Sequence, residues 1–340
     1  MPTPTVYPSA KQFIGLAKET TQGTAVTPIT ATIPVDKFEP EDKPTWLDDL
    51  SFRGSMANLA GEVQGVEIVE WSIPDSPAFF DTLPYFVNNI LGDITDSGAT
   101  PVSHAISLLN SGTGQPGSLT LVDWQGPPSA SFFARVYPGA CVSELTIKGN
   151  AESSLIMWSA KGLAWPSSVA AAAPTPATSA DTPFGAWRTL LGLGGVAGGG
   201  TQVKTAREWE VTIKRALKAE YTLQGSQNPF VIFRGAVDVE GKLAFSVPAD
   251  ESNSMTYLLN NTQPQLQVVV DNGLTLGNNR NLQVDCQLAA YQTSKINRSA
   301  EAVGYDATFK AVMNSTNAGA SGGLSPIKVT FKNNTAAATY

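Results

Sequence analysis

The sequence predicts a mainly β protein built from two tandem β-barrel or β-sandwich domains, each with a flanking α-helix. Two observations carry this prediction. Apolar and polar residues alternate with a period of two in many short segments of the 340 residues, which is typical of half-buried strands. One strand-then-helix pattern also occurs twice, and neither copy contains side chains arranged for catalysis.

The two copies of this pattern share the order of their parts. The first runs from the alternating segment 63–69 through Ile73-Pro74-Asp75 into an apolar helical stretch. The second runs from segment 239–245 through Val247-Pro248 into a stretch with apolar residues at helical spacing. We therefore predict an internal duplication that aligns residues 63–69 with residues 239–245.

Alternation predicts the individual strands, and turn sequences rich in Gly, Asn, Asp and Pro separate them. The predicted strands are 63–69, 118–122, 144–148, 155–160, 208–215, 265–270, 282–288, 304–313 and 327–331. We also predict that 187–193 pairs with 208–215 across the glycines between them, and that 50–53 corresponds to 211–214 in the duplication.

The first helical stretch carries clear start and stop signals. Ser76 is a candidate N-cap, Pro77 suits the first helical position, and Gly92 is a candidate stop. Pro84 lies inside the apolar pattern, where a proline costs about 3 kcal/mol. The helix is therefore predicted either to kink at Pro84 or to begin late.

The domain organisation follows from a change in composition. Residues 166–181 are rich in Ala and Pro and poor in charge, which is typical of a linker. They separate a first domain (1–165) with an extended arm at about 13–46 from a second domain (182–340).

Composition excludes several function classes. A net charge of −7 argues against a groove that holds a phosphate backbone. The N-terminus has no secretion signal, and no segment reaches the roughly 18 apolar residues of a membrane span. Cys141 and Cys286 lie in alternating segments, so we predict buried free thiols; a disulfide between the repeats and a metal or catalytic role are the alternatives.

Catalytic and metal-binding groups are also scarce. The single histidine, His104, lies in an alternating segment and has no evident nucleophile or acid beside it. One His and two distant Cys do not supply a zinc site. The acidic residues Glu39, Glu41 and Asp42 lack the spacing of a calcium loop and are predicted to lie in a solvated loop. The sequence predicts no enzyme activity, no cofactor and no metal.

The N-terminal stretch 13–28 shows a family resemblance. It reads Phe-Ile-Gly-Leu-Ala-Lys-Glu-Thr-Thr-Gln-Gly-Thr-Ala-Val-Thr-Pro and closely resembles the opening of tail tube proteins (major tail proteins) of long noncontractile-tailed bacteriophages. No single motif is specific, but their order and spacing match over nearly the whole chain. The further matches are Gly61-Glu-Val-x-Gly65 to Pro74-Asp75, His104 and the strand after it, Ser118-Leu-Thr-Leu121, Pro138-Gly-Ala140 to Leu145-Thr-Ile147, and Val329-Thr-Phe-Lys-Asn333 to Tyr340.

The resemblance implies a structural virion protein whose subunits pair strands around a ring, so that an inner barrel lines a channel. Rings then stack through extended arms, which makes 13–46 the candidate contact segment. The candidate residues for contacts between rings or subunits are Phe13, Lys18, Glu19, Thr20 and Trp46.

The resemblance also implies partners and a location. The chain is expected to polymerise with itself around a tape-measure protein and to meet tail terminator and baseplate or tail-tip proteins, in the virion tail after assembly in the host cytoplasm. A ring would hold three chains if both repeats are tube domains, as a pseudo-hexamer, and six chains if they are not. DNA would pass through the lumen without specific binding, and the net charge predicts a carboxylate-lined wall.

Two other functions remain open from the sequence. A secreted carbohydrate-binding or adhesin β-sandwich fits the low charge density and the seven Trp, although a secretion signal is missing. A capsid decoration or tail terminator protein is a second possibility within the virion.

Overall fold

The computed structural model describes residues 8–126, 134–152, 155–170, 175–179, 181–198, 200–246, 251–273, 279–298 and 303–340. Strands dominate these residues, which confirms the mainly β prediction. The helices among them are α1 (Leu83–Leu91), α2 (Glu251–Leu259) and the short 3-10 helices η1 (Ser9–Lys11) and η3 (Ala186–Arg188).

The described residues form eighteen strands. In chain order these are β1 (Phe13–Lys18), β2 (Ala31–Ile33), β3 (Glu39–Asp49), β4 (Gly61–Pro77), β5 (Gly92–Ser97), β6 (Val102–Leu108), β7 (Leu119–Trp124), β8 (Ala134–Asn150), β9 (Met157–Ala164), β10 (Ser168–Val169), β11 (Thr189–Leu193), β12 (Ala206–Glu220), β13 (Val231–Phe245), β14 (Leu266–Asp271), β15 (Asn281–Cys286), β16 (Ala289–Asn297), β17 (Gly304–Ala311) and β18 (Lys328–Asn333).

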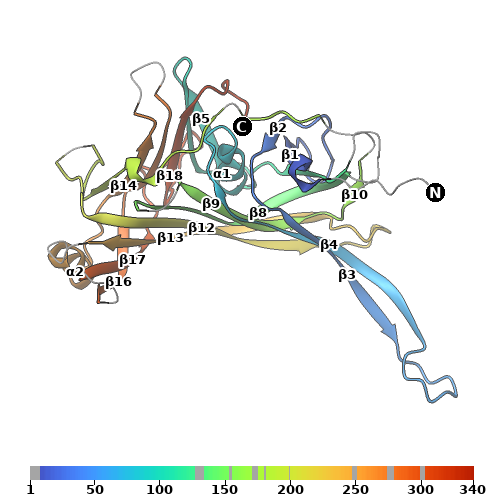
Figure 1. Ribbon diagram of the computed structural model, residues 1–340. Coiled ribbons are helices and arrows are strands. Elements are labelled where there is room, and N and C mark those ends of the chain that lie inside the picture. Colours follow the sequence, from blue (N-terminus) through green and yellow to red (C-terminus); the bar gives the residue numbers. More distant parts are fainter. Residues whose placement is uncertain are drawn as a thin grey trace.

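These described strands form two sheets (Figure 1). In the larger sheet one continuous path of antiparallel neighbours runs β3-β4-β9-β8-β12-β13-β17-β16, while β7, β1, β2 and β10 branch from β8. The smaller sheet has the order β11-β14-β15-β18-β6-β5. Neither sheet closes on itself within the described residues, so the architecture is sandwich-like rather than a closed barrel.

The hydrophobic core lies between the two sheets and includes α1. Every residue of this helix except Asn88 is buried, and the helix contacts β8 of the larger sheet and β5 and β6 of the smaller one. The ring of Phe86 lies 4.8 Å from that of Trp158. Asn89 satisfies buried backbone groups of β8, because its side chain accepts from the Val142 N–H and donates to the Ala140 carbonyl.

The start of α1 corrects one sequence prediction and settles another. Ser76 and Pro77 belong to the end of β4, so they do not begin the helix. The helix begins at Leu83 and holds Pro84 in its first turn, where a missing N–H costs nothing, so the predicted late start is confirmed. Gly92 ends the helix with a φ of 96°, as predicted from its type.

The larger sheet contains the same four-stranded unit twice. In the first unit the order is β3-β4-β9-β8, and in the second it is β12-β13-β17-β16. The hairpin β3–β4 has a bulge between Pro44 and Trp46, and the hairpin β12–β13 has one between Arg215 and Leu217. Between its bulge and its tip, each hairpin contains the same number of residue pairs. The last pair is Asp49 with Gly61 in the first hairpin and Glu220 with Val231 in the second.

The second hairpin of each unit matches equally well. The pair β8–β9 is bulged between Val142 and Glu144, and the pair β16–β17 between Tyr291 and Thr293. Both helices that follow the first hairpin of a unit span nine residues. The two units therefore carry bulges at corresponding positions. Because bulges are specific features of a sheet and not defects, this agreement indicates an internal duplication.

The structural register of the duplication differs from the predicted one. Bulge matching makes Trp71 of β4 the counterpart of Gly241 of β13, whereas the sequence pattern aligned Gly65 with Gly241. Likewise Lys43, and not Arg53, corresponds to Lys214. The Val247-Pro248 part of the pattern lies outside the described residues.

The partner of β11 also differs from the predicted one. This strand pairs with β14 in the smaller sheet, from Thr189 with Val270 to Leu193 with Leu266. The sequence predicted that it pairs with β12, so that prediction is wrong. The strands β11 and β12, which follow each other in the chain, therefore belong to different sheets.

The two units join through β8 and β12, which pair from Glu144 with Lys214 to Asn150 with Glu208. Arg215 of the second unit reinforces the junction. Its buried guanidinium donates to the carbonyl of Ile90 in α1 and to that of Gly114 in the connection between β6 and β7, both at 2.7 Å. Because Ile90 lies in the last turn of α1, this contact also satisfies a carbonyl that the helix leaves unpaired.

Cysteines and the predicted linker fit into this body. Cys141 and Cys286 are both buried and free, as predicted. Burial raises the pKa of the Cys286 thiol to about 12, so it stays protonated at neutral pH. Within the described part of 166–181, the Ala177 carbonyl accepts from the Thr32 N–H on β2, and the Ala177 N–H donates to the Thr32 hydroxyl.

Gly162 provides a test of how tightly the first unit is packed. A Cβ at this position of β9 would lie 1.9 Å from the Cys141 carbonyl oxygen and 2.7 Å from the Trp71 ring. We expect Gly162→Ala to lower the free energy of unfolding by about 3 kcal/mol, measured by urea denaturation. Gly61→Ala is the control, because its Cβ would meet only ordinary contacts at 3.8 Å. Equal stability of the two variants would contradict the packing described.

Candidate functional site

The hairpin β3–β4 projects away from the rest of the molecule (Figure 1). Among the described residues its strands pair only with each other from the tip as far as Ile68, and residues 50–60 connect them at the tip. A two-stranded ribbon of this length has no core of its own, and an isolated hairpin is at best marginally stable in water. Its outer half is therefore available for contact with another molecule.

Apolar side chains are concentrated on this projecting part. Phe52 and Met56, in the tip, are fully exposed at 106% and 103% of their reference areas. The apolar residues of the strands and beside the tip that are also more than half exposed are Trp46, Leu47, Leu50, Leu59 and Val63. Several large, exposed apolar side chains on one projecting element indicate an interaction site.

The tip of the hairpin β12–β13 is hydrogen-bonded to the base of the hairpin β3–β4. Gln227, in the connection between β12 and β13, donates to the Gly65 carbonyl at 2.9 Å and accepts from the Glu67 N–H through its own carbonyl at 3.2 Å. The Tyr221 hydroxyl donates to the Glu67 carbonyl. These bonds fix the direction in which the first hairpin leaves the body.

Charged side chains hold the base of the projecting hairpin. Lys43 on β3 forms ion pairs with Glu41 and with Glu70 on β4. The hydrogen bond to Glu70 raises the pKa of Lys43, which stays charged at any physiological pH. Here one lysine faces two carboxylates, so the exposed edge keeps an excess of negative charge.

The two strands at the ends of the eight-strand path of the larger sheet each have one unpaired edge within the described residues. The strand β3 pairs only with β4, and β16 pairs only with β17. They form the two ends of the eight-strand path. Free edges offer unpaired N–H and C=O groups to another strand, and proteins usually protect them. Pro40 and Pro44 on β3 remove two N–H donors from its free edge, and the carbonyl groups and remaining N–H groups of that edge stay open to another strand.

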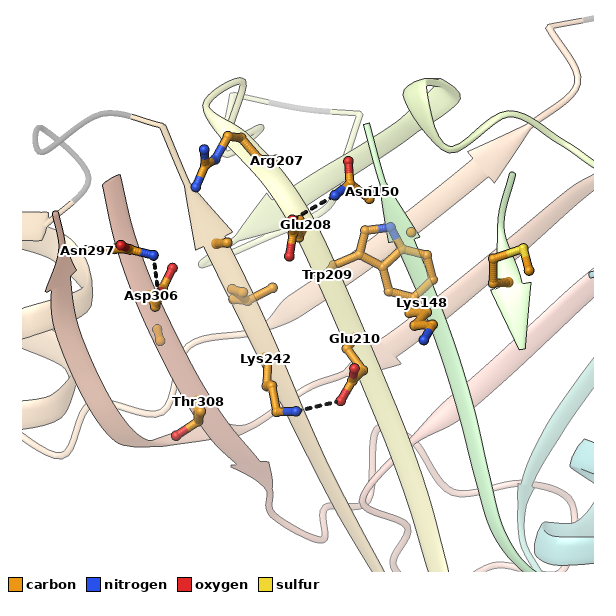
Figure 2. A pocket seen from close by; sticks show the side chains of 15 residues that line it. Lys148, Asn150, Arg207, Glu208, Trp209, Glu210, Lys242, Asn297, Asp306 and Thr308 are labelled. Carbon is orange, nitrogen blue, oxygen red and sulfur yellow. Dashed lines mark hydrogen bonds and ion pairs between the residues drawn. The ribbon is translucent and has the colours of Figure 1, made fainter. Parts of the chain in front are cut away.

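The face of the sheet opposite the core carries charges in cross-strand pairs. A hollow of about 490 Å³ lies on this face and is lined by residues of β8, β9, β12, β13, β16 and β17. Figure 2 shows the polar side chains around it. Glu210 and Lys242 form an ion pair at 3.1 Å, and Asn150 donates to Glu208. Asn297 donates to Asp306 at the other side of the hollow.

The same alternation of sign continues across the neighbouring strands. Glu144 on β8 lies opposite Lys161 on β9 and opposite Lys214 on β12, and Lys161 pairs with it at 3.0 Å. Lys214 also pairs with Glu240 on β13. The face is therefore a mixed lattice of lysines and carboxylates, and the net charge of the chain does not produce a uniformly acidic surface here.

The five contact residues predicted from the sequence lie in different places. Trp46 lies on the projecting hairpin. Phe13 stacks on Trp124 within the body at 5.1 Å, and Lys18 donates to the backbone oxygen of Tyr340. Thr20 is exposed and Glu19 is buried. Residues 13–18 form β1, which is paired on both sides, so the projecting element begins only at Glu39.

Glu19 has a structural role in the body. Its carboxylate accepts hydrogen bonds from the Ser118 and Thr120 hydroxyls and from the Gly23 and Gly139 N–H groups, at 2.5 to 3.0 Å. Burial raises the pKa of Glu19, and these four bonds oppose that rise. They tie the end of β1 to β7 and β8.

The remaining candidates for chemistry are also structural. His104 is fully buried and lies between Asp96 Oδ1 at 2.6 Å and Asn333 Oδ1 at 3.2 Å. The acidic residues 39–42, predicted to lie in a loop, belong to β3, so that prediction is wrong. No three His, Cys, Asp or Glu side chains of the described residues converge as metal ligands.

Phe52 and Met56 were not singled out by the sequence. They lie in a short segment whose first four residues were matched with 211–214, and their exposure cannot be read from residue type. A usable signal was the position of residues 50–60 between two segments that pair with each other. The free edge of β16 had no signal, because a strand pattern does not tell an edge from a centre.

Comparison with known proteins identifies the family of this chain. No helix in the described part of the chain is long and apolar enough to cross a membrane. No curated protein matches the chain. A family model described as phage tail tube protein matches residues 9–332, nearly the whole chain and both four-stranded units. The chain thus belongs to the phage tail tube protein family, whose members are structural components of the virion tail.

Proposed function

We propose that this chain polymerises into stacked rings that form the tail tube of a long noncontractile-tailed phage, and that DNA leaves the virion through this tube. The observation that carries the proposal is the repeated four-stranded unit. Its eight strands form one open path with a free edge at each end, as expected of an arc that is completed by further copies.

Three chains per ring are favoured over six. If the two units are equivalent positions, three chains supply six units and twenty-four strands along one closed path. With strands about 4.8 Å apart and tilted by about 40°, such a barrel has a diameter of about 50 Å between opposite backbones. Side chains reduce this opening, which still exceeds the width of a DNA duplex.

The charge-paired face of the sheet is the proposed wall of the channel. A phosphate backbone binds where lysines and arginines are free to replace its counterions. On this face Lys161, Lys214 and Lys242 are already paired with carboxylates. DNA would therefore pass without being held, which needs no uniformly acidic wall.

The projecting hairpin is the proposed contact between successive rings. Burial of its exposed apolar tip against an adjacent ring would stabilise the stack, and this assigns the role of arm to residues 39–77 with Trp46 as one contact residue. The tube would be assembled around a tape-measure protein in the host cytoplasm and end on terminator and tail-tip proteins.

Electron microscopy and mass measurement test this function directly. Purified protein, concentrated and viewed in negative stain, is expected to form rings or hollow tubes. Three chains of 35.8 kDa give a ring of about 107 kDa, and six chains would give about 215 kDa. Monomers at all concentrations, with glycan binding, would instead support the carbohydrate-binding alternative.

A further inference from the structure

We infer that the edge strand β3 of one chain pairs antiparallel with β16 of the next chain in one defined register, with Glu41 opposite Lys295 of the neighbouring chain. The inference rests on the proposed ring and specifies its interface. It follows from the junction between β8 and β12, which the chain forms within itself.

The two edges are the structural counterparts of the strands at the internal junction. Matching bulges make β16 the counterpart of β8, because Glu144 follows the bulge of β8 as Thr293 follows that of β16. Matching bulges also make β3 the counterpart of β12, because Lys43 precedes Pro44 as Lys214 precedes Arg215. A junction between chains would therefore repeat the junction within the chain.

Transfer of the internal register gives the pairs between chains. Within the chain, Glu144 lies opposite Lys214, Thr146 opposite Thr212 and Lys148 opposite Glu210. Adding 149 to a residue number of β8 gives its counterpart on β16, so Glu144 corresponds to Thr293. Adding 171 to a residue number of β3 gives its counterpart on β12, so Lys43 corresponds to Lys214. The transferred pairs are Thr293 with Lys43, Lys295 with Glu41 and Asn297 with Glu39.

The charges at the two edges complement each other in this register. Glu41 lies opposite Glu70 on β4, so two carboxylates are adjacent in the sheet with Lys43 as their ion-pair partner. Lys295 is the one charged residue of β16, and it lies opposite Asp306 on β17. Pairing would place Lys295 between Asp306 and Glu41, as Lys214 lies between carboxylates at the internal junction.

An apolar side chain at the β16 edge is left partly uncovered, as expected of a strand that lacks a second neighbour. Ile296 is 37% exposed, whereas its counterpart Ile147, on a strand that is paired on both sides, is 2% exposed. The helices leave room for the pairing, since α2 packs on β16 as α1 packs on β8, and α1 does not prevent β8 from pairing with β12.

The backbone of β3 sets the hydrogen-bonding phase. Pro40 and Pro44 turn their nitrogens away from β4. The backbone nitrogen and carbonyl groups of the even-numbered residues 40–44 therefore point to the free edge of β3. Glu41 then lies at a position without hydrogen bonds to the neighbouring strand. Cα atoms in such antiparallel pairs are about 4.5 Å apart, which a disulfide can bridge.

A disulfide between chains tests the register. In the variant Glu41→Cys/Lys295→Cys, oxidised rings are expected to give dimers and closed trimers on a non-reducing gel, while the native Cys141 and Cys286 stay buried. The control Lys43→Cys/Lys295→Cys is displaced by two residues and is expected to cross-link at least tenfold less. Rings that form without a 41–295 cross-link, or that cross-link equally in both variants, would overturn the register but leave the proposed function intact.

A charge exchange gives an independent readout. Lys295→Glu places three carboxylates together and is expected to lower ring formation at least tenfold, and adding Glu41→Lys is expected to restore it. Lys204→Glu, an equal charge change at an exposed position away from both edges, is expected to have no effect. Normal assembly of Lys295→Glu would reject the inferred pair. Failure of the unmodified protein to form any ring would reject both the inference and the proposed function.

Discussion

Replacing Phe52 and Met56 with serine is expected to leave rings intact and to prevent their stacking into tubes. Both side chains are fully exposed in the subunit, so their removal takes nothing from the core. Burial of a Phe or Met side chain contributes about 1.5–3 kcal/mol, and a ring of three chains would lose six such contributions at each interface. Because the six lost contributions add up over one rigid interface between rings, we expect the variant to form almost no tubes.

Tube length in electron micrographs and the unfolding midpoint of the subunit measure this effect. The matched control is Ser55→Ala with Arg53→Ser, which changes the same tip without touching its apolar residues. Arg53 forms an exposed ion pair with Asp49, and such pairs contribute little to stability. Tubes of normal length from the Phe52→Ser/Met56→Ser variant would remove the tip from the stacking contact.

Replacing Arg215 with methionine is expected to lower the free energy of unfolding by about 3–5 kcal/mol. Arg215 is 5% exposed, and its guanidinium donates to the carbonyls of Gly235, Ile90 and Gly114. Burial and the neighbouring Arg234 lower the pKa of Arg215 to about 10, so it is still charged at neutral pH. Methionine fills similar space but leaves three carbonyls without this donor.

Urea denaturation of the subunit provides the measurement. Arg215→Lys is expected to recover only part of the loss, because an ammonium cannot reach three carbonyls in different directions. Arg53→Met, at an exposed ion pair, is the control and is expected to cost less than about 1 kcal/mol. A cost for Arg215→Met as small as that of the control would show that the two units do not depend on this side chain.

Much of the fold follows from local pattern. Alternation identified the strands that have one buried face, such as β8, β12 and β17, and residue type identified the end of α1 at Gly92. The strand β3 could not be predicted in this way. Two prolines and several acidic residues contradict strand propensity, and the segment is a strand because β4 pairs with it along its length.

The register of the duplication and the pairing partners of the strands were harder to predict from the sequence. The similarity of Val63-x-Gly65 to Val239-x-Gly241 suggested an alignment that the bulges contradict, because glycine in the second unit accommodates the Phe309 ring and the first unit places Gly162 against Trp71 instead. The pairing of β11 was wrong for a similar reason, since its distant partner β14 outcompetes the strand that follows it in sequence. The candidate site depends on exposure, which only the assembled sheets reveal.

The covalent link between the two units changes how a ring can form. In a ring of three chains, half of the six junctions between units already exist when each chain has folded, through β8 and β12. Joining three chains into a ring then takes two associations, whereas joining six separate chains takes five, and each avoided association spares several kcal/mol of translational and rotational entropy. Fusion also makes the two kinds of position in the ring chemically distinct. A mutation can therefore alter alternate positions around the circumference without altering the others, which a ring of six identical subunits does not permit.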